Sequence, residues 1–184
     1  EFIYQYAFDA QAGDIAPLDP PHAVGSTGRQ VLGLRHHPNG RWVYSVEESE
    51  LGRYGYDPAT GALAGQAFFA NPLLAEPIYW TTIEMHASGR FLYAFGKVRG
   101  TNLAIIDVFT VDTTTGELRW VERETGGELH QVIHRGLGGP LLLGNWLYTG
   151  GPGSSDRWRG APLITTYEIA ASDGALSPAG DPLE

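Results

Sequence analysis

Short stretches in which aromatic or β-branched residues alternate with other residues occur along the whole chain, separated by turns that contain glycine. Alternation with a period of two is typical of β-strands that bury one face. No window shows the apolar period of an amphipathic helix. The pattern therefore predicts an all-β protein.

One motif consists of a strand, a short link, a glycine, one further residue and then Leu or Ile. It occurs four times, as "YAFDAQAGDI" (6–15), "YGYDPATGAL" (54–63), "FTVDTTTGEL" (109–118) and "YEIAASDGAL" (167–176). The four glycines are Gly13, Gly61, Gly116 and Gly174. Glycine suits a hairpin reversal because it accepts a positive φ, and an aspartate at the strand end can bond the backbone that follows it.

A second motif lies between copies of the first. "HPNGRWVYSV" (37–46) is echoed by "HASGRFLYAF" (86–95), with Gly40 and Gly89 49 residues apart. A weaker third echo, "LGGPLLLGN" (137–145), places Gly138 another 49 residues on. Two interleaved motifs with one period indicate a repeat protein.

Each repeat is expected to contain four strands. The expected strands are Val31–Leu34, Trp42–Val46, Arg53–Tyr56 and Leu63–Phe69 in one unit, Thr81–Met85, Phe91–Phe95, Ile105–Val111 and Leu118–Glu122 in the next, and Gln131–Ile133, Leu141–Leu143, Leu163–Ile169 and Leu176–Pro178 in the last. Four strands per repeat predict the four-stranded antiparallel blades of a β-propeller. A β-sandwich, or an all-β array without closure, fits the repeat less well.

The expected units are residues 1–30 as the outer part of a blade, then blades at 31–79, 80–128 and 129–184, the last with a polar loop at 150–161. Propellers close with four to eight blades. About three full blades and part of another therefore indicate a piece of a longer propeller, or a chain that assembles with another copy or chain. Open blade edges would favour self-association if the chain is this short.

Composition narrows the classes of partner. The 184 residues carry a net charge of −9, so neither a nucleic acid nor an anionic membrane is an expected partner. Without cysteine there is no disulfide, and a zinc site would need histidine and carboxylate ligands. No apolar run approaches the length of a membrane span, and the first residues lack the pattern of a signal peptide, so a cytoplasmic location is expected.

The order of these motifs resembles that of the seven-bladed lactonase family, which includes one type of 6-phosphogluconolactonase and the fungal 3-carboxy-cis,cis-muconate lactonizing enzyme. The stretches that carry the resemblance are "YAFDAQAGDIAPLDPP", "HHPNGRWVYSVEE", "YGYDPATGALAG", "SGRFLYAFGK" and "FTVDTTTGELRWVE". It is continuous over residues 1–122 and looser to 184. It implies hydrolysis of a sugar lactone such as 6-phosphogluconolactone by acid/base chemistry, without metal or cofactor. A carboxymuconate cycloisomerase and a non-catalytic binding or scaffold propeller are the alternatives.

In the family, the proposed site lies in the central channel and uses His, Arg and Glu from successive blades. The acid after the "HPxGRxxY" strand corresponds to Glu48, and the basic residue of the next blade to Lys97, with Arg99 two residues later. On the third unit, the pair of positions that precedes the "HP" motif in the family falls at His130 and Gln131.

The family also carries an Arg-His or Arg-Trp pair before "HP". Leu32 and Gly33 stand at those positions, so only Arg29 or Arg35, in a shifted register, could replace the arginine. We therefore include Arg35 among the candidate substrate-binding residues.

A small anionic lactone or carboxylate is the expected substrate, because cations hold its charged groups and stabilise an oxyanion. Glu48 would act as the acid/base and His130 would orient or protonate the substrate, while Lys97 and Arg99 would bind the anionic group. The alternative interpretation is that Glu47 and Glu48 form a solvated strand end, that Lys97 and Arg99 lie in an ordinary exposed turn, and that His130 is structural.

A metal site is not expected. His36 and His37 are adjacent on a predicted strand and would point to opposite faces, so they cannot easily share one ion. His37 and His86 lead into repeat turns, which favours a structural role for both.

Overall fold

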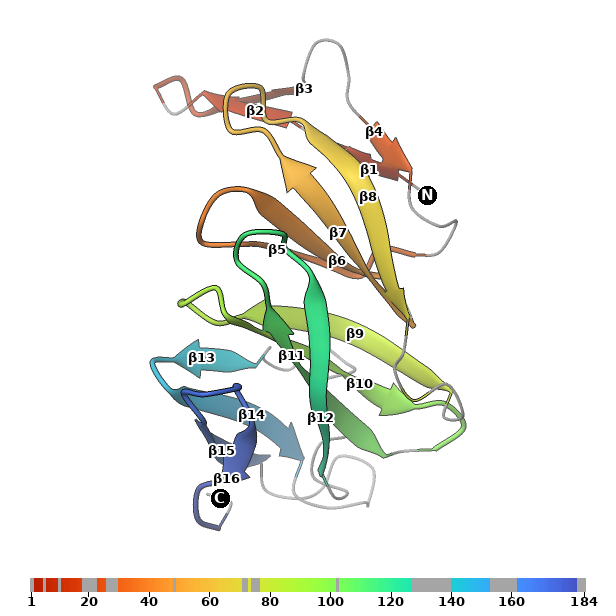
Figure 1. Ribbon diagram of the computed structural model, residues 1–184, viewed down its shortest axis with the longest axis vertical. Helices are drawn as coiled ribbons and strands as arrows, with labels where there is room; N and C mark the ends of the chain where they lie inside the picture. The colour runs from red at the N-terminus through yellow and green to blue at the C-terminus, as the bar shows by residue number, and fades with distance from the viewer. Residues whose placement is uncertain are drawn as a thin grey trace.

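The computed structural model describes residues 2–4, 6–9, 11–17, 23–25, 30–47, 49–70, 73, 77–101, 103–126, 140–152 and 162–181. All regular elements in these ranges are β-strands, which confirms the predicted all-β class (Figure 1). The described residues contain no helix that is long and apolar enough to cross a membrane.

Three antiparallel sheets of four strands each make up most of the structure. We call them the first blade, with β5 (Gly33–His36), β6 (Trp42–Glu47), β7 (Glu50–Tyr56) and β8 (Leu63–Ala70); the second blade, with β9 (Ile78–Met85), β10 (Phe91–Val98), β11 (Ala104–Val111) and β12 (Leu118–Gly126); and the third blade, with β13 (Leu141–Leu143), β14 (Trp146–Pro152), β15 (Pro162–Ile169) and β16 (Leu176–Pro178). In each blade the strands follow one another in chain order, as the repeat predicts.

Two short strand pairs precede the first blade. β2 (Tyr6–Asp9) pairs with β3 (Asp14–Pro17) in what we call the N-terminal hairpin, and β1 (Phe2–Tyr4) pairs with β4 (Ala23–Gly25). In the first motif, the chain turns between the strand-end residue, usually aspartate, and the glycine; we call this the Asp-to-Gly turn. The N-terminal hairpin carries its first copy, with Gly13, so the hairpin corresponds to the third and fourth strands of a blade.

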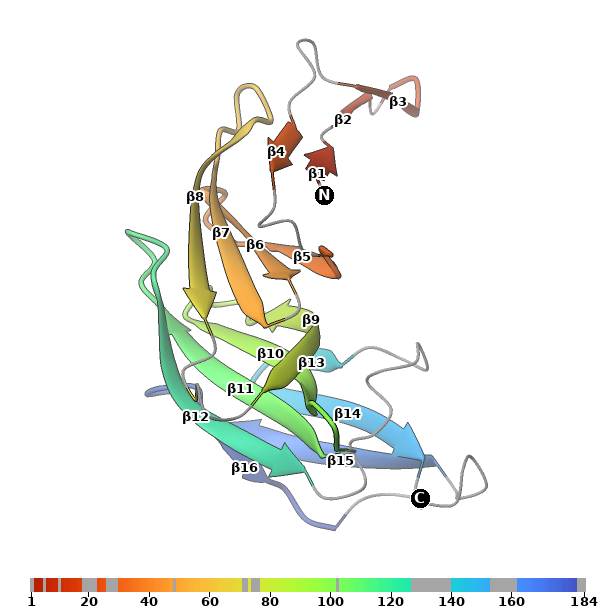
Figure 2. The same ribbon diagram turned by 90° about the vertical axis from the view of Figure 1, so that its right-hand side faces the viewer.

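The blades are stacked face to face in an open arc. Figure 2 shows β5, β9 and β13 along the concave side and β8, β12 and β16 along the convex side. This is the arrangement of propeller blades around a central axis, with the first strand of each blade innermost, and here the arc is not closed.

Apolar side chains fill the two spaces between neighbouring blades. One cluster joins Tyr44, Val46 and Leu51 of the first blade to a set from the second blade, which includes Trp80 and Phe109. A second cluster joins the other face of the second blade to the third blade, with the members Phe91, Tyr93, Phe95, Ile106, Val108, Leu147, Tyr167, Ile169 and Leu176. Because each blade buries one face against each neighbour, stacking supplies the core that a single sheet lacks.

The Asp-to-Gly turns have the predicted local chemistry. In the second blade, the Asp112 carboxylate accepts backbone N–H bonds from Thr114 (2.8 Å) and Thr115 (3.0 Å). These bonds favour the ionised form and lower the pKa of Asp112. Gly116 then adopts a φ of 73°, a left-handed conformation that other residues rarely take.

A tyrosine from each preceding blade bonds the carbonyl of this turn glycine. Tyr44 Oη donates to the Gly116 carbonyl at 2.8 Å, and Tyr93 Oη donates to the Gly174 carbonyl at 3.1 Å. The ring of Trp42 lies against Gly116, where a Cβ would come within 2.7 Å of it. Burial raises the pKa of both tyrosines, so their hydroxyls remain protonated donors.

A histidine makes a parallel contact nearer the concave side. His37 Nε2 lies 2.8 Å from the Gly89 carbonyl, and His86 Nε2 lies 2.9 Å from the Gly144 carbonyl. The Nδ1 atom of His37 accepts the backbone N–H of Asn39, so Nε2 carries the proton and donates. The predicted structural role of these two histidines is confirmed.

The third blade has a different register from the one predicted. Leu141–Leu143 is its first strand, not its second, and the second strand is Trp146–Pro152. The Ile169 N–H bonds the Asn145 carbonyl, as the Val111 N–H bonds the Arg90 carbonyl in the second blade. The true echo of the strand motif is therefore "NWLYTG", and Gly138 does not mark the turn.

The difference between the predicted and the observed strands of the third blade has a local cause. The first turn of the third blade is a tight connection through Gly144 and Asn145, shorter than the turns at 37–41 and 86–90. Gln131–Ile133, predicted as the first strand, lies outside the described residues.

The contact at Gly116 leads to a stability prediction. Gly116→Ala should destabilise the protein by about 2–5 kcal/mol, because it combines left-handed strain with overpacking against Trp42. Gly40→Ala is the matched control, since Gly40 has a φ of 73° and no described atom within 4 Å of its Cβ position. It should cost only the strain, about 1–2 kcal/mol. Urea unfolding measures both, and equal losses would contradict the prediction.

Candidate functional site

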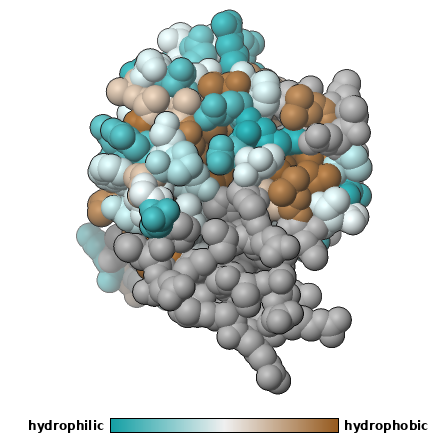
Figure 3. Space-filling model, turned by 90° about the horizontal axis from the view of Figure 1, so that it is seen from below, coloured by the Kyte–Doolittle hydropathy of each residue, from teal (hydrophilic) through white to brown (hydrophobic). Residues whose placement is uncertain are grey.

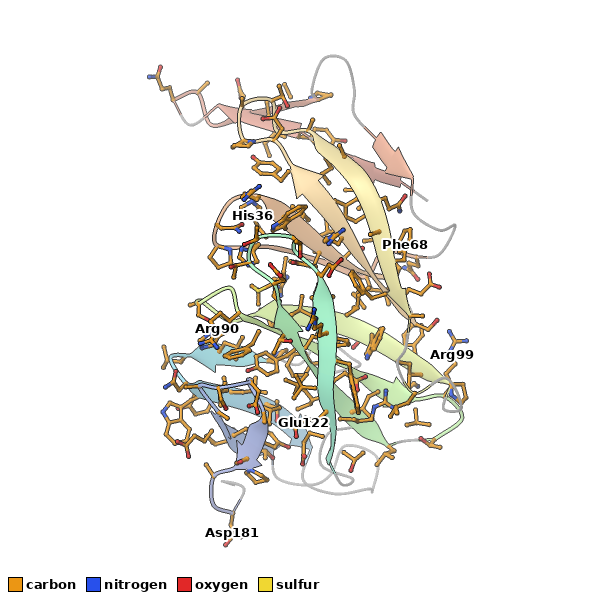
Figure 4. All side chains as sticks on the ribbon, in the orientation of Figure 1. His36, Phe68, Arg90, Arg99, Glu122 and Asp181 are labelled. Atoms are coloured by element: carbon orange, nitrogen blue, oxygen red, sulfur yellow. The ribbon has the colours of Figure 1, made fainter. Side chains whose placement is uncertain are left out.

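The second and third strands of each blade are joined at one edge of the arc. Backbone bonds place the turns at 37–41 and 57–62 together at one end of the first blade, so the turn between Glu47 and Glu50 lies at the opposite end. The loop between β10 and β11 lies at the equivalent end of the second blade. Figure 4 shows Arg99 at this edge, while His36 and Arg90 lie at the other. We call the edge that carries Arg99 the loop edge.

Two of the candidate substrate-binding residues lie at the loop edge. Lys97 is half-buried in β10, opposite Tyr79 and Ala104. The exposed Arg99 donates from Nε to the Ile78 carbonyl at 3.0 Å, and its guanidinium lies 5.6 Å from the centre of the Tyr79 ring. These contacts hold the charge of Arg99 close to the start of β9.

The proposed catalytic residues Glu48 and His130 lie outside the described residues. Their roles therefore stay predictions, and the structure places only the strands that lead to them.

Glu47, next to Glu48 in sequence, is fully buried. Its Oε1 atom accepts hydrogen bonds from Ser45 Oγ at 2.8 Å and from Tyr54 Oη at 2.7 Å. Burial and the bond to Glu47 raise the pKa of Tyr54 to about 12, which keeps its hydroxyl a donor at neutral pH. The interpretation of Glu47 as part of a solvated strand end is wrong, because its carboxylate anchors the end of β6 inside the blade.

The second blade places its buried carboxylate on a different strand. Asp107 on β11 is fully buried and accepts bonds from Arg123 at Nε (2.8 Å) and Nη2 (2.9 Å). It also accepts the indole N–H groups of Trp80 (2.8 Å) and Trp120 (3.3 Å). Four donors satisfy this carboxylate, as a buried charge requires.

In each of these two blades a glycine stands where the other blade has its buried carboxylate. Gly52 stands in the first blade where Asp107 stands in the second, and a Cβ at Gly52 would lie 2.3 Å from Ser45 Oγ. Gly96 stands in the second blade where Glu47 stands in the first, and a Cβ there would lie 2.2 Å from the Tyr79 carbonyl. A glycine on one strand thus accompanies a buried acid on the other.

Arg35, the third candidate substrate-binding residue, pairs across the blades with Glu84. Its Nε atom donates to Glu84 Oε2 at 2.9 Å, Nη2 bonds Oε1, and Nη1 donates to the Leu34 carbonyl at 2.8 Å. The bond with Glu84 raises the pKa of Arg35. Both residues lie on innermost strands, so this pair joins two neighbouring blades close to the concave side of the arc (Figure 2).

The structure does not bring Arg35 to the other two candidates. Glu84 and Tyr79, the neighbours of Arg35 and Lys97 respectively, are five residues apart on β9, which corresponds to about 17 Å along the strand. Lys97 and Arg99 therefore form one group at the loop edge, and Arg35 belongs to another.

Sequence reasoning missed the residues that complete these groups. Glu84 lies 49 residues after Arg35, at the equivalent position of the next repeat, so an opposite charge one period away was the available signal. Asp107 and Arg123 face each other across neighbouring strands, and only their pairing register joins them. In the described part of the chain, no group of three or more His, Asp or Glu residues could hold a metal ion.

Comparison of the sequence with models of protein families and with curated proteins gives no match. Solved structures do match. A "putative 6-phosphogluconolactonase" from Bacteroides uniformis is similar over 99% of this chain and 48% of its own, with a TM-score of 0.76 and 19% identity. A protein from Lactobacillus plantarum matches with a TM-score of 0.67 and 16% identity, over 97% of this chain and 48% of its own. A functionally unknown protein from Desulfotomaculum acetoxidans matches with a TM-score of 0.63 and 17% identity, over 96% of this chain and 54% of its own.

These similarities show the fold. The chain is a run of β-propeller blades, and it spans about half the length of the structures that it matches.

The two ion pairs differ in burial, which leads to a second stability prediction. Asp107→Asn should cost about 3–5 kcal/mol, because it leaves the buried guanidinium of Arg123 without its counter-charge. Arg35→Gln should cost at most about 1 kcal/mol, since the exposed fractions of Arg35 and Glu84 are 38% and 19%. Thermal and urea unfolding measure both, and a larger loss for Arg35→Gln would contradict this order.

Proposed function

We propose that the protein is a lactone-processing enzyme that hydrolyses a sugar lactone such as 6-phosphogluconolactone by metal-independent acid/base chemistry. The fold shared with the Bacteroides uniformis structure supports this proposal. So does the position of two cationic side chains at the end of the second blade that is equivalent to the strand end leading to Glu48 in the first blade.

In this proposal Glu48 takes a proton from water as the water oxygen attacks the lactone carbonyl carbon. His130 gives a proton to the ring oxygen when the bond between that oxygen and the carbonyl carbon breaks, so the product is the open hydroxy acid. Lys97 and Arg99 hold the phosphate or carboxylate of the substrate by charge-assisted hydrogen bonds.

The observation that carries the proposal is the equivalence of two strand ends in adjacent blades. Glu48 and Lys97 follow the same strand position in successive repeats, one acidic and one basic. Buried Glu47 fixes the first of these ends, and the contacts of Arg99 with β9 fix the second. This anchoring supports the proposal, because acid/base catalysis needs catalytic groups that are held in place.

One observation favours a second candidate, a non-catalytic propeller that binds a ligand. Arg35 donates hydrogen bonds to Glu84 and to the Leu34 carbonyl, so its guanidinium is already engaged within the protein. In addition, Leu32 and Gly33 stand where the family has its Arg-His pair. A carboxymuconate lactonizing activity remains the alternative reaction at the loop edge, since its substrate is also a carboxylate.

The test is whether the protein hydrolyses 6-phosphogluconolactone faster than the spontaneous reaction. Continuous titration of the released acid measures the rate. Glu48→Gln should lower kcat by about 10²–10⁴-fold, the usual contribution of a general acid/base. Lys97→Ala combined with Arg99→Ala should raise KM for the phosphorylated lactone and leave KM for the unphosphorylated lactone nearly unchanged. Arg119→Ala, an exposed charge at the start of β12, is the matched control and should change neither.

Two results would contradict the proposal. If neither sugar lactones nor 3-carboxymuconolactone react faster than in buffer, the protein does not process lactones. If Glu48→Gln retains full activity, Glu48 is not the acid/base.

A further inference from the structure

The turn that joins β5 to β6 contains Asn39 followed by Gly40, the single Asn-Gly pair of the sequence. Figure 3 views the end of the molecule that the third blade forms, where polar and apolar side chains are mixed. The Asn-Gly turn lies elsewhere, on the first blade, and it contacts the second blade. The chemistry of this turn therefore concerns an interface between two neighbouring blades.

An asparagine that precedes a glycine is open to attack by its own backbone. The deprotonated glycine nitrogen attacks Cγ of the side-chain amide, a five-membered succinimide forms, and Nδ2 leaves as ammonia with the proton that the backbone lost. One water molecule then opens the ring at either carbonyl, so the product is aspartate or isoaspartate. Glycine has no Cβ to hinder the attack. Apart from its chain neighbours, no described atom lies within 4 Å of the position that a Gly40 Cβ would take.

Hydrogen bonds hold both reacting groups in the folded chain. The Gly40 N–H donates to the His37 carbonyl at 2.9 Å, so the nucleophilic nitrogen keeps its proton while the turn is closed. Asn39 Nδ2 donates to the Thr113 carbonyl of the second blade at 2.9 Å, and its Oδ1 accepts the Arg41 N–H at 3.0 Å. These bonds must break before the nitrogen reaches Cγ, so the reaction requires local opening of the turn.

The bond between Asn39 and Thr113 links the first blade to the second, and neither product can make it again. In aspartate an oxygen replaces Nδ2, and an ionised carboxylate only accepts hydrogen bonds, so it cannot donate to the Thr113 carbonyl. Isoaspartate has the same carboxylate chemistry and also adds a methylene to the main chain of the turn. Conversion therefore removes a contact from the interface that the bond from Tyr44 to Gly116 also joins.

The second blade has Ser88 at the equivalent position, and serine has no amide that could react. The Ser88 N–H donates to His86 Nδ1 at 3.2 Å, and its Oγ accepts the Arg90 N–H at 3.2 Å. Asn39 makes the same two bonds in the first blade. Serine thus supports this turn without the reactive group, which makes Asn39→Ser the matched control.

We propose that Asn39 is a site of spontaneous deamidation, at which opening of the turn leads to aspartate or isoaspartate and weakens the contact between the first and second blades. Opening of the turn is reversible, whereas the loss of ammonia is not, so the converted form accumulates with time. Water is the only co-reactant.

Peptide mass spectrometry tests the site. The chain is incubated folded and in urea at the same temperature and mildly alkaline pH, and chromatography separates aspartate from isoaspartate. Asn39 should convert in both samples, at least about tenfold more slowly in the folded chain, because only the open turn reacts. Asn145, which precedes a bulky tryptophan, should stay intact over the same period. Equal rates in the two samples, or an Asn39 amide that survives in either of them, would overturn the proposal.

Ageing of the folded protein tests the consequence for the interface. The converted chain carries an additional negative charge, so anion exchange separates it from the unconverted chain. Its urea midpoint should be lower than that of the unconverted chain, and freshly prepared Asn39→Asp should show a similar decrease relative to the wild type. Asn39→Ser should keep its own initial midpoint when it is aged in the same way.

Two outcomes of the ageing experiment contradict the proposal. One is a converted chain that unfolds at the same urea concentration as the unconverted chain, and the other is an equal decline of wild type and Asn39→Ser with time. Lactone hydrolysis enters none of these measurements, so this proposal and the proposed function fail separately.

Discussion

The stacking of the blades depends on a hydrogen bond from a buried tyrosine to the carbonyl of a left-handed glycine in the next blade. The bond works because glycine has no Cβ, so an aromatic ring can lie directly on the turn while the phenol reaches the carbonyl. Burial keeps the phenol protonated and removes competition from water. Since the same pair recurs at both interfaces between the three blades, these blades adopt the same relative position, and stability accumulates through nearest-neighbour contacts.

Within this frame the blades differ in where they bury charge. The first blade buries Glu47 from its second strand, and the second buries Asp107 from its third strand, with a glycine at the other position in each case. The same tyrosine-to-glycine contact is present at both interfaces of these blades, whichever strand carries the buried acid. Rigid repeats that carry variable strand ends are how propellers generally combine one fold with different sites.

The charged side chains considered above lie at two different places on the blades. Lys97 and Arg99 lie at the loop edge of the second blade. The Arg35–Glu84 pair instead joins the first strands of the first and second blades.

The sequence by itself determined the elements that depend on local chemistry. Alternating residues specify the strands, and Asp and Gly at fixed offsets specify the turns, so the repeat and the class of fold could be predicted. Burial and pairing between repeats depended on the tertiary structure. The acid Glu47 looks solvent-exposed in sequence and is buried, and the third blade changes register because one turn is shorter. Arg35 finds Glu84 only because stacking brings residues 49 positions apart into contact, and such contacts follow from the packing of whole blades, which no local pattern encodes.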